Sequence, residues 1–276
     1  MTSHDVVNRV RRLAGTRRVG HLGTLDPMAT GVLPLLVERA TRLARFLSGG
    51  AKEYDAHIRF GYRTNTYDRE GIPEGPRTEP SIPQREVEAA LARFQGTFLQ
   101  TPPPVSAKKV GGTPAYKLAR KHIEVELKPV EITVYEIALV SYENPVARVR
   151  VRCSAGTYIR SIAHELGQFF GCGAVLDELR RTESGGFTEA DSKTLVELSA
   201  RAEAGRFEEA LVPVSRLLPD FPIETVDSET AVQIRHGRDF RASGASQFVR
   251  ALSPEGVLIA IGEARLPNLF HPVVVL

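Results

Sequence analysis

One carboxylate, Asp26, lies in a stretch of the chain whose residue types favour tight turns. Two glycines precede it, Pro27 follows at once, and Gly31 closes the segment before an apolar run. Pro27 biases Asp26 away from helical angles and removes one backbone donor, while the glycines allow close backbone approach or a positive φ. A carboxylate on a rigid loop is a common way to present a reacting group. The alternative is that Asp26 caps a helix near residues 28–47, because Asp is a favoured cap. These residue types leave both interpretations open.

The motif around Asp26, G-H-x-G-T-L-D-P-x-A-T-G-V-L, resembles the signature of the TruB family of tRNA pseudouridine synthases. The similarity spans most of residues 1–185, with a weaker match near the C-terminus. Its further segments are residues 52–54, 61–68, 156–160 and 179–182. The resemblance implies that Asp26 is the catalytic residue. It also implies that the chain isomerises a uridine of the tRNA T-arm, position 55 of the tRNA, to pseudouridine.

Two more residues complete the catalytic group that the resemblance implies. The family pairs the Arg of its G-T-Y-I-R segment with the catalytic Asp, and these correspond here to Arg160 and Asp26. An opposite charge nearby favours the ionised form of a carboxylate in a desolvated pocket. Tyr54 matches the family Tyr that stacks on the target base and is a candidate for removing the C5 proton. Outside the motifs, Arg160 would be interpreted as a solvated helix-start residue and Tyr54 as a half-buried strand residue.

Three residues match family positions that contact the substrate or support the site. The target uridine is paired and stacked in a folded arm, so the enzyme must extrude it. The resemblance implies that His21 enters the space left by the flipped nucleotide. It implies that Tyr158 packs under Arg160 and that Leu179 forms a wall of the pocket. The alternatives are a loop-anchoring role for His21 and a core position for Leu179.

Basic residues are concentrated in the first half of the chain. The net charge is +3 over 276 residues, but residues 1–52 carry nine Arg and Lys against three Asp and Glu. Residues 105–129 resemble the inserted RNA-binding loop of the bacterial family, which closes over the tRNA arm. We expect Lys108, Lys109 and Lys121 to meet phosphates there, so binding should weaken steeply with salt. The alternative is a solvated hairpin loop.

Composition limits the class of protein. Hydrophobic content of 42% and charged content of 25% are ordinary for a soluble globular chain. No apolar stretch approaches the ~20 residues that span a membrane, and no signal peptide opens the sequence, so we expect a cytoplasmic protein. Cys153 and Cys172 lack the paired spacing of a zinc site and are expected to be free thiols. The family uses no metal or organic cofactor, so none is expected.

The order of strand-like and helix-like segments predicts an α+β fold rather than regular βαβ repeats. Apolar periodicity predicts helices over 3–14, 83–95, 159–170 and 192–204, and strands over 54–62, 132–139 and 147–153. A loop is predicted over 67–83. The resemblance implies a pseudouridine-synthase catalytic domain over 1–212, with a mixed, largely antiparallel sheet flanked by helices.

Short strand signals after a Pro-rich linker at 213–222 predict a small C-terminal β domain. Residues 220–276 resemble a PUA-like RNA-binding domain, and a generic small β domain fits the pattern nearly as well. At the other end, the family pattern begins with a strand that carries a Lys-Pro pair. We expect that first strand, roughly a dozen residues long with its turn, to be missing from this sequence.

Together the motifs and charges predict a stand-alone tRNA pseudouridine synthase that acts on the T-arm as a monomer, with no guide RNA. One alternative is the catalytic subunit of a guide-RNA-dependent pseudouridylation particle. The basic loop at 105–129 and the lack of basic tails favour the stand-alone enzyme. Another alternative is a non-catalytic RNA-binding or folding protein. The presence of Asp26, Tyr54 and Arg160 argues against it, because binding alone would not need all three.

Overall fold

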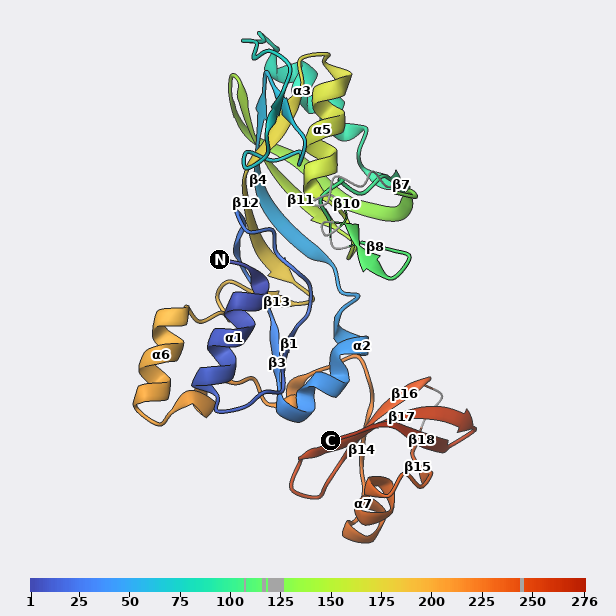
Figure 1. Ribbon diagram of the computed structural model, residues 1–276. Coiled ribbons are helices and arrows are strands. Elements are labelled where there is room, and N and C mark those ends of the chain that lie inside the picture. Colours follow the sequence, from blue (N-terminus) through green and yellow to red (C-terminus); the bar gives the residue numbers. More distant parts are fainter. Residues whose placement is uncertain (107, 116–117, 119–126, 244–245) are drawn as a thin grey trace. The chain divides into compact units, whose positions relative to one another are not determined.

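The computed structural model describes residues 1–106, 108–115, 118, 127–243 and 246–276. The chain forms two compact units, each assembled from separate segments (Figure 1). The first unit comprises Met1–Ser3, Gly23–Pro34 and Gly49–Ser192, and the second comprises His4–Leu22, Leu35–Ser48 and Lys193–Leu276. Asp26 therefore belongs to the first unit, whereas His21 belongs to the second.

A mixed sheet forms the centre of the first unit. Among the described residues its strand order is β13-β12-β4-β11-β10-β7, and β2 pairs with β12. All of these pairs are antiparallel except β2–β12, which is parallel. The strands are β2 (Thr30–Gly31), β4 (Lys52–Phe60), β7 (Gly96–Gln100), β10 (Val130–Glu143), β11 (Val146–Cys153), β12 (Ala174–Ser184) and β13 (Phe187–Thr188).

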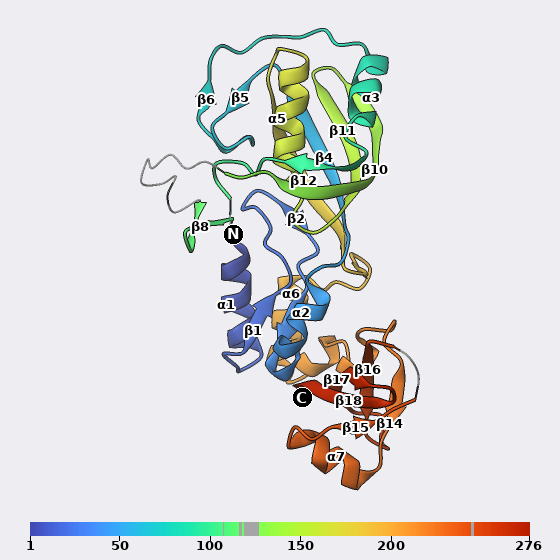
Figure 2. The ribbon, with the colours of Figure 1, turned by 90° about the vertical axis from the view of Figure 1, so that its right-hand side faces the viewer.

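One face of this sheet is buried beneath two helices, α3 (Gln84–Ala92) and α5 (Ile159–Phe169), as Figures 1 and 2 show. Successive strand residues point to opposite faces. In β4 the residues from Lys52 to Phe60 therefore alternate between buried and half-exposed, and Tyr54 is on the buried side. The apolar alternation of β11 packs against the same core. This face carries the helix and strand residues that form the candidate site.

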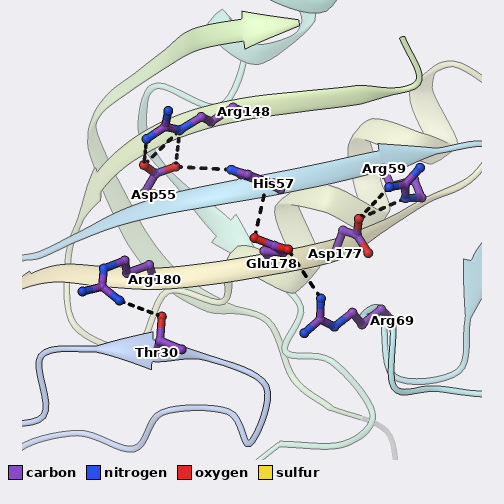
Figure 3. A network of polar contacts seen from close by, with 9 residues as sticks. All are labelled: Thr30, Asp55, His57, Arg59, Arg69, Arg148, Asp177, Glu178 and Arg180. Atoms are coloured by element: carbon purple, nitrogen blue, oxygen red, sulfur yellow. Dashed lines mark hydrogen bonds and ion pairs between the residues drawn. The ribbon is translucent and has the colours of Figure 1, made fainter. Parts of the chain in front are cut away.

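The opposite face of the sheet is charged (Figure 3). Asp55 of β4 accepts hydrogen bonds from Arg148 of β11 at 2.5–3.1 Å. Arg59 of β4 forms an ion pair with Asp177 of β12 at 3.0 Å. These side chains are partly exposed, so each pair contributes little to stability. Their main effect is to keep this face polar.

Two short hairpins complete the described part of the first unit. One joins β5 (Arg63–Thr64) to β6 (Pro73–Glu74), and the other joins β8 (Lys109–Val110) to β9 (Thr113–Pro114). The second hairpin lies within the expected 105–129 loop.

In the part of the chain that the structure describes, the second unit contains a small layer of helices with the two-stranded sheet β1-β3, and a separate five-stranded sheet. Val7, Val10 and Val19 form a buried cluster against α6 (Leu195–Glu203). The remaining elements of that layer are α1 (Ser3–Leu13), β1 (Val19–His21), β3 (Leu35–Val37), η1 (Glu38–Leu43), α2 (Ala44–Leu47), η2 (Phe207–Ala210) and η3 (Val214–Arg216). The sheet runs in the order β14-β16-β17-β18-β15. Its strands and its helix are β14 (Ile223–Thr225), α7 (Ser228–Arg235), β15 (Phe240–Arg241), β16 (Phe248–Leu252), β17 (Leu258–Leu266) and β18 (Leu269–Val275).

The predicted α+β class is confirmed, with a mixed and largely antiparallel sheet. The predicted helices correspond to α1, α3, α5 and α6, and the predicted strands to β4, β10 and β11. A helix near 28–47 is wrong, because β2 and β3 occupy residues 30–31 and 35–37 and helical structure begins only at Glu38. Asp26 therefore does not cap a helix. Strand β12 was missed because both polar and apolar residues are buried along it.

Gly31 closes the loop that carries Asp26, and its backbone lies against β12. Its φ is +96°, and an added Cβ would lie 2.1 Å from the carbonyl oxygen of Arg181. Gly75 has a similar φ of +85° with open space around the Cβ position. Gly31→Ala should therefore destabilise the protein by at least about 2 kcal/mol more than Gly75→Ala, which carries the backbone strain alone. Urea unfolding of both variants measures this, and equal losses would contradict the close approach.

Candidate active site

Asp26 lies at the first position of a tight turn in the loop between Gly23 and Pro34. The amide N–H of Ala29 donates to the Asp26 carbonyl at 2.9 Å, with Pro27 at the second position, where its fixed φ suits the turn. Met28 is buried in the core beside the sheet. The loop is therefore anchored directly next to the carboxylate.

Ser3 fixes the residue that precedes Asp26. Its hydroxyl accepts a hydrogen bond from the Leu25 amide at 2.9 Å and donates to the Leu25 carbonyl at 3.2 Å. The Ser3 side chain is buried. Both polar groups of the Leu25 backbone are thereby satisfied, which limits movement of the carboxylate.

The ion pair expected between Asp26 and Arg160 is confirmed. Arg160 is the second residue of α5, and its Nη2 and Nε donate to the two carboxylate oxygens of Asp26 at 2.8 and 3.0 Å. Its Nη1 donates to the Thr66 carbonyl at 3.0 Å and lies 3.5 Å from a carboxylate oxygen of Asp68. The Arg160 side chain is 5% exposed, whereas that of Asp26 is 29% exposed. The guanidinium is thus enclosed and the carboxylate stays accessible.

The start of α5 is held by β7. The amide of Gln100, which is fully buried, donates to the Tyr158 carbonyl at 3.1 Å and accepts from the Tyr158 N–H at 2.8 Å. The Ser161 hydroxyl donates to the Thr101 carbonyl at 2.8 Å. A helix start leaves backbone groups without intrahelical partners, and these contacts fix its position. These contacts thereby fix the backbone position from which the Arg160 side chain extends toward Asp26.

Tyr54 and Leu179 extend the site along the sheet. Tyr54 of β4 is in register with Arg181 of β12, and Leu179 lies two residues before Arg181 on the same face. Burial raises the pKa of Tyr54 to about 12, although the positive charge of the Arg181 guanidinium opposes this rise. The Asp26 charge contributes to the rise, which is in keeping with its proximity to Tyr54. Leu179 is buried in the core cluster.

Tyr158 is the residue immediately before α5, two positions ahead of Arg160. Burial raises the pKa of Tyr158, while the nearby charge of Arg160 lowers it. Both tyrosines therefore remain neutral phenols near neutral pH. The neutral phenols, the carboxylate and the guanidinium form a group that could bind a planar ring beside a nucleophile.

Four further residues were predicted to bind the substrate: His21, Lys108, Lys109 and Lys121. His21 is in β1 of the second unit, where its backbone is paired with Leu35. Lys108 is exposed and Lys109 begins β8. Lys121 lies outside the described residues. The binding roles expected for these four residues stay predictions.

Three functional candidates were not assigned from the sequence. Asp68 and Arg181 lie in segments that resemble family motifs, so those motifs were a signal for them. Gln100 lies in none of these motif segments, so nothing in the sequence marked it as a functional residue. Among the described residues, no group of three or more His, Cys, Asp or Glu could hold a metal ion. None of the helices there is long and apolar enough to cross a membrane.

Comparison with sequence models of known families identifies the family of this chain. Residues 11–159 match the TruB family pseudouridylate synthase N-terminal domain, and residues 160–219 match the tRNA pseudouridylate synthase B C-terminal domain. The chain belongs to the TruB family of pseudouridylate synthases.

Full-length relatives agree with the family models. A tRNA pseudouridine synthase B of Solibacter usitatus (strain Ellin6076) is 54% identical over 280 residues, covering 100% of this chain and 96% of the relative. One of Thermobifida fusca (strain YX) is 43% identical over 282 residues, covering 99% and 94%.

Solved structures share the fold at lower identity. A chain from the crystal structure of a Cbf5-Nop10-Gar1 complex has a TM-score of 0.73 at 27% identity, covering 97% of this chain and 76% of that one. A chain from an H/ACA RNP bound to a substrate RNA containing 2'-deoxyuridine has the same TM-score at 26% identity, covering 100% and 80%.

The pKa of Tyr54 leads to a prediction about stability at high pH. In the unfolded chain the phenol ionises near pH 10, whereas in the folded chain it ionises near pH 12. Between these values the unfolded state binds fewer protons, so stability falls as pH rises. Tyr54→Phe should remove on the order of 2 kcal/mol of this loss, since one pKa unit corresponds to about 1.4 kcal/mol. Urea unfolding across this range measures it. Exposed Tyr135→Phe is the control, and identical pH slopes for all three proteins would contradict the prediction.

Proposed function

We propose that this protein isomerises a uridine in the T-arm of tRNA, at position 55, to pseudouridine, and that Asp26 is the essential catalytic residue. The observation that carries the proposal is the accessible Asp26 carboxylate held by the buried Arg160 guanidinium. Membership of the TruB family and the tRNA pseudouridine synthases B among its full-length relatives support the same reaction.

The reaction breaks the N1–C1′ bond of uridine, rotates the base, and rejoins it through C5. Asp26 would add to C6 of the ring or to C1′, or would promote formation of a glycal by taking a ribose proton. Each route needs a carboxylate at a fixed position, and the two hydrogen bonds from Arg160 hold the Asp26 carboxylate in place. Tyr54 would stack on the base and serve as a candidate for removing the C5 proton. Tyr158 would support Arg160, and Leu179 would form a wall of the pocket.

A uridine in a folded T-arm must leave its stack before it reaches Asp26. His21 would fill the space that the flipped nucleotide leaves. Residues 105–129 would bind the phosphates of the arm, with Lys108, Lys109 and Lys121 as the proposed contacts. The C-terminal β domain, residues 220–276, would act as a PUA-like RNA-binding module beside a catalytic domain over 1–212.

A guide-RNA-dependent reaction is the second candidate, because the solved structures of similar fold include an H/ACA RNP. Identity favours the stand-alone reaction, at 54% to a tRNA pseudouridine synthase B against 26% to the H/ACA RNP chain. Incubating the protein alone with unmodified tRNA distinguishes the two. Pseudouridine at position 55 without any added RNA supports the stand-alone enzyme, whereas no product would contradict it.

Replacing Asp26 by Asn should abolish product formation while tRNA still binds, because the carboxylate performs the chemistry and many other contacts supply affinity. We expect the single-turnover rate to fall at least roughly a thousandfold, as for other essential nucleophiles. Mapping pseudouridine by chemical modification and primer extension measures it, beside filter binding of tRNA. Exposed Asp220→Asn is the control. If Asp26→Asn kept a turnover within roughly tenfold of wild type, Asp26 would not be the essential catalytic residue.

The 105–129 loop should contribute affinity rather than chemistry. Replacing Lys108, Lys109 and Lys121 together with Ala should reduce the slope of log affinity against log salt by roughly 1 for each lost phosphate contact. The rate at saturating tRNA should change little, because no side chain of the loop has a role in making bonds. Arg85→Ala, on the exposed side of α3, is the matched control. An unchanged slope with a collapsed rate would instead make the loop a lid over the site.

A further inference from the structure

Arg181 is a fully buried guanidinium on β12, directly opposite Tyr54 in the sheet. Among the residues that the structure describes, it forms no ion pair with a carboxylate; its hydrogen-bond acceptors include three backbone carbonyls. A buried charge without a counter-ion is costly unless its donors are satisfied. The identity of those acceptors therefore indicates what the residue does.

The three carbonyls lie at the two ends of the loop that carries Asp26. Arg181 Nη2 donates to the Gly23 carbonyl at 3.1 Å and Nη1 to the Thr24 carbonyl at 3.4 Å. Its Nε donates to the Val32 carbonyl at 2.8 Å, and its own backbone carbonyl accepts from the Val32 N–H at 2.8 Å. One side chain thus fastens the loop on both sides of Asp26.

The same residue is paired with Tyr54 across the sheet. The positive charge of its guanidinium opposes the effect of burial on the pKa of the Tyr54 phenol. Lys52 lies close by, since burial and the Arg181 charge both lower the pKa of its ammonium group. Both cations lie against Gly23, where an added Cβ would be 3.3 Å from Lys52 Cε and 3.7 Å from Arg181 Nη1.

We propose that Arg181 is a positioning residue for the reaction: through one guanidinium it fixes both ends of the Asp26 loop to β12, the strand on which it lies directly opposite Tyr54. This inference rests on the proposed catalytic role of Asp26. Arg181 acts on the rate of the chemical step and not on tRNA affinity, because it is buried and its contacts lie within the protein. A purely structural residue would instead lower thermal stability and leave the rate of the folded protein unchanged.

The test is a series at one position, Arg181→Lys, Arg181→Gln and Arg181→Ala, with Arg150→Gln as the control. Arg150 is an exposed arginine of β11, opposite Asp55 of β4 and away from the Asp26 loop. Single-turnover rates are measured with saturating unmodified tRNA, together with tRNA affinity and thermal melting of each variant. We expect each folded Arg181 variant to lose roughly 100-fold in rate, as for a displaced catalytic group, with tRNA affinity unchanged. Arg150→Gln should keep the wild-type rate.

Adding guanidinium ion at millimolar concentration to Arg181→Ala separates positioning from stability. Because the ion can supply the missing donors, it should restore part of the rate, whereas the same concentration of urea should not. Lys carries the charge but cannot bridge three carbonyls, so Arg181→Lys should stay slow. Wild-type rates in folded variants, full recovery with Lys, or variants that are all unfolded would each overturn the positioning role. Inactive wild-type protein would instead contradict the proposed function.

Discussion

The contact between Asp26 and Arg160 is the interaction on which the candidate site depends. It joins a turn near the start of the chain to the first residues of α5, far along the sequence. The guanidinium is almost fully enclosed, so its desolvation must be offset by its partners. It reaches both oxygens of Asp26, the Thr66 carbonyl and the Asp68 carboxylate. These contacts make the loop at 61–68 and the start of α5 parts of the same site.

Two buried arginines support the Asp26 loop in different ways. Arg160 binds the carboxylate itself, whereas Arg181 binds backbone carbonyls on either side of it. Rigid support matters because a small displacement of a reacting group has a large effect on rate. The Asp26 side chain nevertheless stays partly exposed beside these buried anchors, so the carboxylate is accessible to a substrate.

The fold does not by itself select the RNA that enters the site. The structures with a TM-score of 0.73 come from particles that contain other proteins or RNA, while the full-length relatives are tRNA pseudouridine synthases B. A shared fold can carry different substrates. We therefore expect a difference in substrate to arise outside the sheet that holds Asp26, and the basic 105–129 segment is the surface proposed here to bind RNA.

The sequence determined the elements and the chemistry of the loop. Apolar periodicity located α1, α3, α5 and α6 with β4, β10 and β11, because these elements bury one face each. The resemblance of the motif around Asp26 to a family signature indicated the family before any geometry was known. Tertiary structure alone decided the rest. Strand β12 buries the charged Arg181 among apolar residues, so its sequence has no regular alternation of apolar and polar residues. Gln100 holds Tyr158 through the backbone N–H and carbonyl of Tyr158, and no pattern of side chains in the sequence reveals such contacts. A helix over 28–47 failed because the loop closes onto β12 at Gly31, a contact between segments far apart in the sequence.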